Sequence, residues 1–250
     1  MRKLTRPLLP STATNVLARL SARVSGDENP ATRLKTAARL WKNKRRAKAS
    51  ARAFDDVYAA LLHMTGGRGR CMYCEDSFGT DIEHFWPKAT YPKRTFEWNN
   101  YLLACSHCNS NLKRSQFPFK NGRPSLLNPS VDDPALHLVF VPSNGEFSSI
   151  GPKGQPSIDV FGLNDRTTPR RLPDGRKSAF IKLQLLLLDY DSQMTSGRYA
   201  EAAETKRVLL DEPFSTVLGW LVSTARADAG SALLRSGVGA AVMRHGVDRW

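Results

Sequence analysis

The four cysteines of this 250-residue sequence constrain its fold more than any other feature, because all of them fall in two Cys-x-x-Cys pairs. The first pair is Cys71 and Cys74, and the second is Cys105 and Cys108. Each such turn sets two thiolates on one side of a tight loop, so two turns can complete a tetrahedral site. The sequence therefore predicts a structural zinc ion that closes residues 71–108 into a compact loop.

A redox function is the alternative for these cysteines. A thioredoxin-type site needs a single Cys-x-x-Cys pair, so two pairs clustered in one small module favour metal binding. His107 lies inside the second turn. Because four thiols already fill a tetrahedral site, we expect His107 to be no zinc ligand and at most to contact phosphate or support the site from outside it.

The charge of the chain indicates an anionic partner. Lys and Arg number 37 against 23 Asp and Glu, which gives a formal net charge of +14. Nucleic acid is the first candidate, because phosphate contacts reward spread-out Lys and Arg. The densest basic run lies between residues 41 and 52. It is compatible both with a surface that gives non-specific affinity for a DNA backbone and with an ordinary solvated helix face.

The sequence carries no signal for a membrane. No segment is apolar for the ~20 residues that a membrane span requires. The basic N-terminus is interrupted by Pro7 and Pro10 and lacks the apolar core of a signal peptide. We therefore expect a cytoplasmic protein with no membrane partner, and in that compartment cysteines bind metal more often than they form disulfides.

Hydrophobic periodicity and chain breakers predict an α+β fold, mainly helical, in three parts. Residues 1–69 form a basic helical region, residues 70–120 form the cysteine-bounded core, and residues 121–250 hold a hairpin followed by helices. The hairpin is centred on Asn144-Gly145, a dipeptide typical of two-residue turns.

The breaker residues also set the expected helix limits. Asn29-Pro30 is a good helix start and no breaker follows until Gly66-Gly67, so one long helix is expected between them. Leu185 to Leu188 is apolar on all sides and is expected to be buried. Further helices are expected over residues 11–24, 179–194, 199–212 and 214–229.

Within the loop closed by the cysteines, residues 81–88 read DIEHFWPK and place an acid beside a histidine. Hydrolysis of a phosphodiester needs a base to activate water and a cation to hold the phosphate. Histidine suits the first task, and carboxylate and amide oxygens suit Mg²⁺. On an extended segment Glu83 and His84 point to opposite faces, so that one can bind metal while the other faces water.

The second cysteine turn supplies further candidates. Asn109 directly follows Cys108, and the zinc ion would return it toward the strand that carries His84. Lys113 lies four residues later, about 40° around an α-helix from Asn109, so it can point at the same phosphate. A lone histidine is more often structural than catalytic, but the neighbouring Glu83 and Asn109 favour the catalytic interpretation of His84.

In order, the patterns Cys-x-x-Cys, Glu-His-x-x-Pro and Trp-x-Asn-Tyr-Leu-Leu-x-Cys-x-x-Cys-Asn resemble the HNH endonucleases, the His-Me finger or ββα-metal family. The resemblance covers residues 71–119 and implies a zinc-framed ββα-metal HNH module flanked by helices. It implies a general base at His84 and an acidic ligand for Mg²⁺ or Mn²⁺ at Glu83, where aspartate is usual. Asn100 matches the residue that braces the loop of the base, and Asn109 matches a metal-binding His or Asn.

Two positions depart from the family pattern. Glu83 is one methylene longer than aspartate, and the usual lysine three residues after the final Asn is Leu112, with Lys113 next. The wider layout is similar to the HNH subunits of anti-phage systems of the Septu (PtuB-like) type. That similarity implies an ABC/SMC-like ATPase partner, and the HNH resemblance implies a DNA substrate, here expected to be double-stranded.

The sequence leaves two other functions open. A catalytically inactive zinc-knuckle subunit that binds DNA or acts as a scaffold would carry the same cysteines and charge. A secreted HNH toxin would need an export signal, which the N-terminus does not resemble. Asp81 could support the site from outside it, and Asp132-Asp133-Pro134 is expected to form a turn and a helix cap instead of a second metal site.

Overall fold

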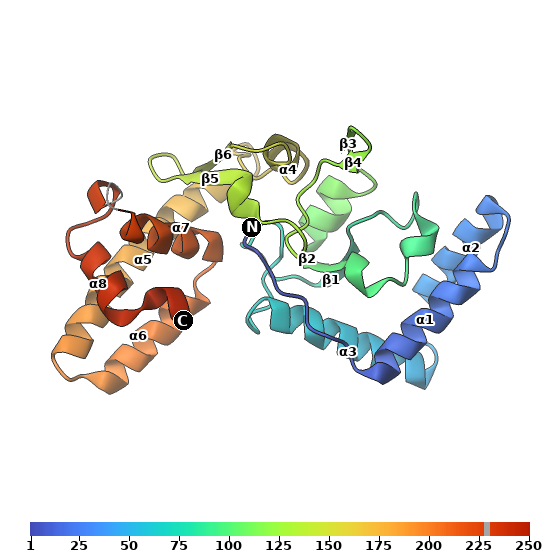
Figure 1. The fold of residues 1–250 in the computed structure, drawn as a ribbon, viewed down its shortest axis with the longest axis horizontal. Helices are drawn as coiled ribbons and strands as arrows, with labels where there is room; N and C mark the ends of the chain where they lie inside the picture. The colour runs from blue at the N-terminus through green and yellow to red at the C-terminus, as the bar shows by residue number, and fades with distance from the viewer. Residues whose placement is uncertain (228–230) are drawn as a thin grey trace. The chain divides into compact units, whose positions relative to one another are not determined.

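The computed structural model describes residues 1–227 and 231–250 and shows an α+β protein in which helices predominate (Figure 1). The predicted fold class is confirmed at this level. In the part of the chain that is described, no helix combines the length and apolar character needed to cross a membrane.

The chain groups into two compact units, which we call the N-terminal unit and the C-terminal unit. The N-terminal unit comprises residues 3–73 and 77–132, and the C-terminal unit comprises residues 1–2, 74–76 and 133–250. The division expected from the sequence, into residues 1–69, 70–120 and 121–250, stays a prediction.

Three helices begin the N-terminal unit: α1 (Ser11–Ser25), α2 (Pro30–Lys42) and α3 (Lys48–Met64). Asn29 caps α2 as predicted, because its Oδ1 accepts the backbone N–H of Ala31 at 2.8 Å. Ala13 and Val16 of α1 pack with Ala53 of α3 in a small hydrophobic cluster. Helix α1 contacts both α2 and α3.

The single long helix predicted between Asn29 and Gly66 is wrong, since residues 43–47 form a turn between α2 and α3. Asn43 ends α2 by donating its Nδ2 hydrogen to the Arg39 carbonyl oxygen at 2.9 Å. Five of the seven residues from 42 to 48 are Lys or Arg. Like charges on neighbouring helical positions repel one another, and the turn lets both helices contact α1.

Two short strands, β1 (Asp81–His84) and β2 (Tyr101–Ala104), pair antiparallel with His84 opposite Tyr101. Every residue of β2 is buried, so this strand anchors β1 in the interior. A second, smaller hairpin pairs β3 (Phe119–Lys120) with β4 (Arg123–Pro124).

In the sequence, the π-helical segment η3 (His107–Lys113) lies between β2 and β3. The Asn109 carbonyl oxygen accepts the N–H of Arg114 at 2.8 Å, a bond that spans five residues instead of four. Such single-turn π-helices are frequent at functional sites, because the extra residue redirects the side chains around it. A short helix after the second cysteine turn was expected, but its π geometry was not.

The C-terminal unit contains the predicted hairpin around Asn144-Gly145. Gly145 has a φ of 78°, and a Cβ there would lie 1.9 Å from the Pro173 carbonyl oxygen, so the turn requires glycine. The strands and α-helices of the C-terminal unit are β5 (Leu138–Val141), β6 (Glu146–Ser149), α4 (Gly154–Val160), α5 (Leu172–Thr195), α6 (Tyr199–Asp211), α7 (Ser215–Arg226) and α8 (Val238–His245).

Short 3₁₀ turns occur in both units. They span Pro92–Arg94 (η1), Trp98–Asn100 (η2), Pro134–Leu136 (η4), Ser231–Leu233 (η5) and Val247–Arg249 (η6).

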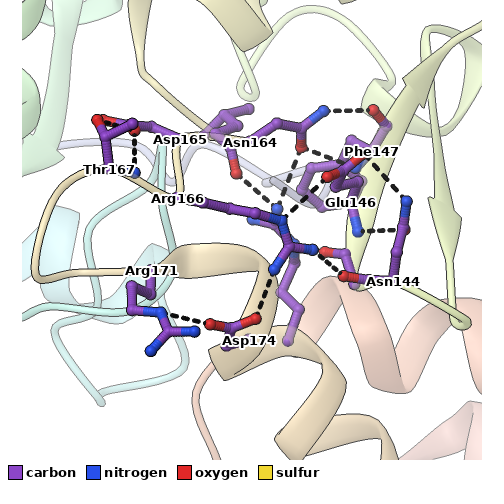
Figure 2. Close-up of polar contacts among 12 residues, drawn as sticks. Asn144, Glu146, Phe147, Asn164, Asp165, Arg166, Thr167, Arg171 and Asp174 are labelled. Atoms are coloured by element: carbon purple, nitrogen blue, oxygen red, sulfur yellow. Dashed lines mark hydrogen bonds and ion pairs between the residues drawn. The ribbon is translucent and has the colours of Figure 1, made fainter.

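Figure 2 shows how this hairpin is tied to the start of α5. The Arg166 guanidinium contacts the Glu146 carboxylate of β6 at 3.2 Å and the Asp174 carboxylate of α5 at 2.6 Å, and it also donates to the Asn144 carbonyl oxygen. Arg171 adds a second cation beside Asp174 at 2.6 Å. These contacts are structural, since both carboxylates already have cationic partners.

The remaining helix predictions are largely confirmed. Helix α7 ends at Arg226. Positions 228 and 229 of the helix predicted over residues 214–229 lie outside the described residues. The prediction that Leu185 to Leu188 is buried on all sides is wrong for Leu185, which is 47% exposed while Leu187 is fully buried. Helix α5 contacts α6, α7 and α8 but keeps one face in solvent.

Candidate active site

The two Cys-x-x-Cys turns come together in the structure. The Sγ atoms of Cys71, Cys74, Cys105 and Cys108 all lie within 4.8 Å of one another, and all four residues are buried. A zinc ion with thiolate ligands at about 2.3 Å holds its sulfurs about 3.8 Å apart. The cluster can therefore bind a zinc ion, and the prediction that the four thiols form one cluster is confirmed.

Main-chain hydrogen bonds fix the cysteine turns to the strands. The N–H of Met72 donates to the Leu103 carbonyl oxygen at 2.8 Å, and the N–H of Leu103 donates to the Met72 sulfur at 3.2 Å. The N–H of Cys108 points at the Cys105 sulfur at 3.5 Å. A donor directed at a cysteine sulfur, as the N–H of Cys108 is, stabilises the thiolate that a metal site requires.

A cation also faces the cluster. Arg170 donates from Nη2 to the Cys74 sulfur at 2.9 Å and to an Asp76 carboxylate oxygen at 3.3 Å. Four thiolates around a divalent ion carry a net charge of about −2. A guanidinium beside one of them offsets part of that charge, so Arg170 suits the thiolate form of Cys74.

His84, the last residue of β1, is 4% exposed. Its Nε2 lies 3.0 Å from the Thr95 carbonyl oxygen. A carbonyl oxygen can only accept, so Nε2 carries the hydrogen and the neutral ring keeps a lone pair on Nδ1. Burial, followed by the charge of Lys88, lowers the pKa of His84 from 6.5 to about 3. The imidazole is therefore unprotonated at neutral pH.

Asn100 holds the loop that follows the histidine. Its Oδ1 accepts the N–H of Trp86 at 2.7 Å, and its Nδ2 donates to the carbonyl oxygens of Trp86 and Arg94, each at 3.0 Å. The side chain is 1% exposed. One buried amide thus uses both ends to fix residues 86–94, and the role of Asn100 in an active site stays a prediction.

Glu83 and Lys113 form a buried ion pair. Lys113 Nζ lies 2.6 Å from Glu83 Oε1 and donates to the His84 carbonyl oxygen at 2.9 Å. Burial raises the pKa of Glu83 and lowers that of Lys113, while their mutual attraction opposes both shifts. At a separation of 2.6 Å with no water between them, attraction favours the charged pair.

His84 also lines a cavity of about 470 Å³. Asp81, His84 and Asn109 line it, and Asn109 Nδ2 donates to Asp81 Oδ2 at 3.0 Å. Trp41, Lys44 and Lys88 line it as well.

The sequence-predicted site residues therefore separate into two groups. His84 and Asn109 line the cavity, whereas Glu83 and Lys113 contact each other and do not line it. Asn100 supports the loop beside them. Asp81, expected only to support the site, lines the cavity with His84. The catalytic roles of these residues stay predictions.

Asp81 and Asn109 present the donors that a hard divalent cation prefers. The carboxylate of Asp81 accepts from Asn109 and, at 3.3 Å, from the Thr80 hydroxyl. Within residues 1–227 and 231–250 no hydrogen-bond donor contacts the amide oxygen of Asn109. One carboxylate and one amide oxygen at the same cavity wall fit Mg²⁺ or Mn²⁺ when water fills the remaining ligand positions.

Sequence reasoning missed several contributors to the cavity, among them Trp41 and Lys44. Trp41 lies in the last turn of α2, and its ring centroid lies 4.3 Å from that of His84. Lys44 follows in the turn after α2. The dense basic run was the only sequence signal for Trp41 and Lys44. No local pattern can predict that residues some forty positions apart in the sequence will contact each other.

The fold and the site define an α+β protein with a buried four-cysteine cluster that can bind zinc and a polar cavity beside a buried histidine. No protein-family model matches the chain. It is similar to Septu protein PtuB of Bacillus mycoides (strain KBAB4), with 34% identity over 150 residues, 47% of this chain and 51% of that protein. Septu protein PtuB of Bacillus thuringiensis is 34% identical over 129 residues, 49% of this chain and 47% of that protein. The chain thus spans about half the length of these curated relatives.

Proposed function

We propose that this protein is a metal-dependent HNH endonuclease that hydrolyses phosphodiester bonds in DNA. One observation carries the proposal: a neutral, buried histidine lines the same cavity as a carboxylate and an amide that fit a divalent cation. The similarity to Septu protein PtuB supports a role in bacterial anti-phage defence. Within that role the proposal makes this protein a nuclease effector that works with an ATPase partner.

His84 is the general base in this proposal. Because Nε2–H is engaged by the Thr95 carbonyl oxygen, Nδ1 is the atom that accepts a proton from water. A base with a pKa near 3 is weak, however. A phosphate anion in the cavity would favour the protonated imidazole and raise the pKa of His84 toward the range in which a base is effective.

Asp81 and Asn109 would hold the catalytic cation in this conformation. When bound, Mg²⁺ or Mn²⁺ supplies positive charge that stabilises the departing 3′-oxygen. Glu83, the ligand implied by the family resemblance, is neutralised by Lys113 and would have to leave that ion pair to contact the cation. In this proposal Glu83 acts chiefly by positioning the end of β1.

The four-cysteine cluster and Asn100 supply rigidity in this proposal. The cluster ties the turn before β1 to the turn after β2, so a bound zinc ion would fix the strand of His84 against the segment of Asn109. Asn100 holds residues 86–94, the segment whose Thr95 neighbour accepts from His84. A precisely held base lowers the cost of reaching the reacting geometry.

Cleavage of supercoiled plasmid with added Mg²⁺ or Mn²⁺ tests the assignment. Wild type should nick or linearise the plasmid, and His84→Ala should reduce the rate by about 100-fold or more. His63→Ala is the matched control, since His63 is an exposed histidine that does not line the cavity. Equal activity of wild type and His84→Ala would refute the catalytic role of His84.

The partner and the rival function need a second experiment. The native protein should be purified from its host and assayed for cleavage with and without whatever protein accompanies it. DNA binding without cleavage in both preparations would favour the inactive zinc-knuckle subunit. Cleavage that requires a co-purifying ATPase would support the proposed effector role.

A further inference from the structure

The turn between α2 and α3 brings a basic wall to the candidate active site. Lys44 and Arg45 lie in this turn, and both line the cavity that also contains His84. In a continuous helix successive side chains point about 100° apart. The turn releases Lys44 and Arg45 from that spacing, and both line the cavity.

Trp41 organises this wall. Lys44 Nζ lies 4.3 Å from the indole centroid, and Lys88 Nζ lies 6.0 Å from the same ring. The His84 ring approaches the indole edge-on with centroids 4.3 Å apart. Two ammonium groups and the candidate base thus gather around a single half-buried tryptophan.

Lys44 and Lys88 differ from Arg45 in their ion pairing within the described residues. Arg45 is paired with Asp55 at 2.5 Å. For Lys44 and Lys88 the described part of the chain provides no carboxylate at ion-pair distance. Burial, and then the charges of Arg45 and Lys88, lower the pKa of Lys44, so like charges are held together at some cost. An anion between the two ammonium groups would remove that repulsion.

We propose that Lys44 and Lys88 form a binding site for a DNA backbone phosphate next to the phosphodiester that is cut. The inference rests on the proposed function and sharpens it: among 37 Lys and Arg, these two set where the strand lies in the cavity. Phosphate contacts of this kind position a duplex without reading its sequence. Trp41 holds the Lys44 stem by a cation–π contact.

DNA binding without cleavage tests this site. The parent is His84→Ala, with no added divalent cation, and a short duplex DNA is titrated between about 50 and 200 mM salt. Lys44→Met/Lys88→Met should reduce the slope of log affinity against log salt by about one per lysine. The control Lys35→Met/Lys177→Met removes two exposed lysines that lie outside the basic run and do not line the cavity, and it should reduce the slope by less than half as much.

Two further variants make the result decisive. Lys44→Arg/Lys88→Arg keeps both charges and should retain the parent slope. If the methionine variant does not fold, Lys44→Gln/Lys88→Gln is measured in its place. A slope equal to that of the control variant, or a parent that does not bind DNA, would overturn the phosphate site. Loss of the proposed function would instead appear as no cleavage by wild type, with the binding difference intact.

Discussion

Lys113 Nζ lies 2.6 Å from Glu83 Oε1 in an interior where neither side chain is more than 4% exposed. The same ammonium group donates to the His84 carbonyl oxygen at 2.9 Å. The ion pair therefore fixes the end of β1 from one side, while the imidazole of His84 lines the cavity. Glu83, which was expected to bind the catalytic cation, instead holds the strand through its ion pair with Lys113.

Breaking this pair from one side should destabilise the protein strongly. Lys113→Met leaves the Glu83 carboxylate buried without a counter-ion, which typically costs about 3–5 kcal/mol. The double variant Glu83→Gln/Lys113→Met should be more stable than Lys113→Met alone, because it removes the stranded charge. Urea unfolding of the two single variants, the double variant and wild type gives the coupling. Glu204→Gln, which breaks an exposed pair with Arg207, is the control and should change little.

Asp81 and Glu83 should respond differently in cleavage assays. Asp81→Asn keeps the size of the side chain but removes the charge beside Asn109, so a role in holding the cation predicts a loss of about 100-fold or more in kcat. Raising the Mg²⁺ or Mn²⁺ concentration should recover part of that loss. Glu83→Gln should reduce stability more than it changes the cation dependence. A stronger cation dependence for Glu83→Gln than for Asp81→Asn would assign the ligand to Glu83.

The buried histidine should make stability sensitive to acid. The pKa of His84 is about 3 in the folded protein and 6.5 as its ordinary value. Between these pH values the unfolded chain binds a proton at His84 that the folded chain does not, so stability falls as the pH drops below 6.5. From neutral pH to about pH 5 the contribution is on the order of 2 kcal/mol.

Urea unfolding at these two pH values, for wild type and His84→Gln, measures the acid effect. The glutamine variant lacks the titrating group and should lose less stability on acidification. The cysteine cluster is the same in both proteins, so its own acid sensitivity cancels in the comparison. Parallel losses in the two proteins would contradict the neutral, buried state of His84.

The cysteine cluster should bind one zinc ion per chain. Elemental analysis of the purified protein gives the stoichiometry directly. Cys105→Ser should lower the zinc content and the midpoint of thermal unfolding together, because a structural zinc site contributes folding free energy. Ser106→Ala changes an exposed neighbour and should alter neither. Wild-type protein that folds without bound metal would refute the structural role.

The variant Arg170→Gln tests how the positive charge next to the cysteine cluster affects zinc binding. Without the guanidinium beside Cys74, zinc affinity should fall by about 10–100-fold, as for other groups that support metal ligands. Competition with a chelator measures the change, and the thiol count of the unfolded protein should be unaltered. Unchanged zinc affinity would mean that the contact between Arg170 and Cys74 does not contribute to zinc binding.

Local patterns in the sequence determined several features. Two Cys-x-x-Cys turns indicated the thiol cluster, Asn29-Pro30 marked the start of α2, and Asn144-Gly145 marked the β5–β6 turn. Each rests on a preference that acts within a few residues: the reach of a chelating turn, a side-chain cap, or a glycine with positive φ. Such preferences can be recognised from a short stretch of sequence without knowledge of the rest of the chain.

The tertiary structure alone decided which polar residues share the cavity. Asp81 and Glu83 are two residues apart on β1, yet only Asp81 lines the cavity, because the interior on the Glu83 side supplies Lys113 as a partner. Trp41 and Lys44 reach His84 because the chain turns after α2. These outcomes depend on contacts between residues far apart in sequence, whose energies no local propensity records.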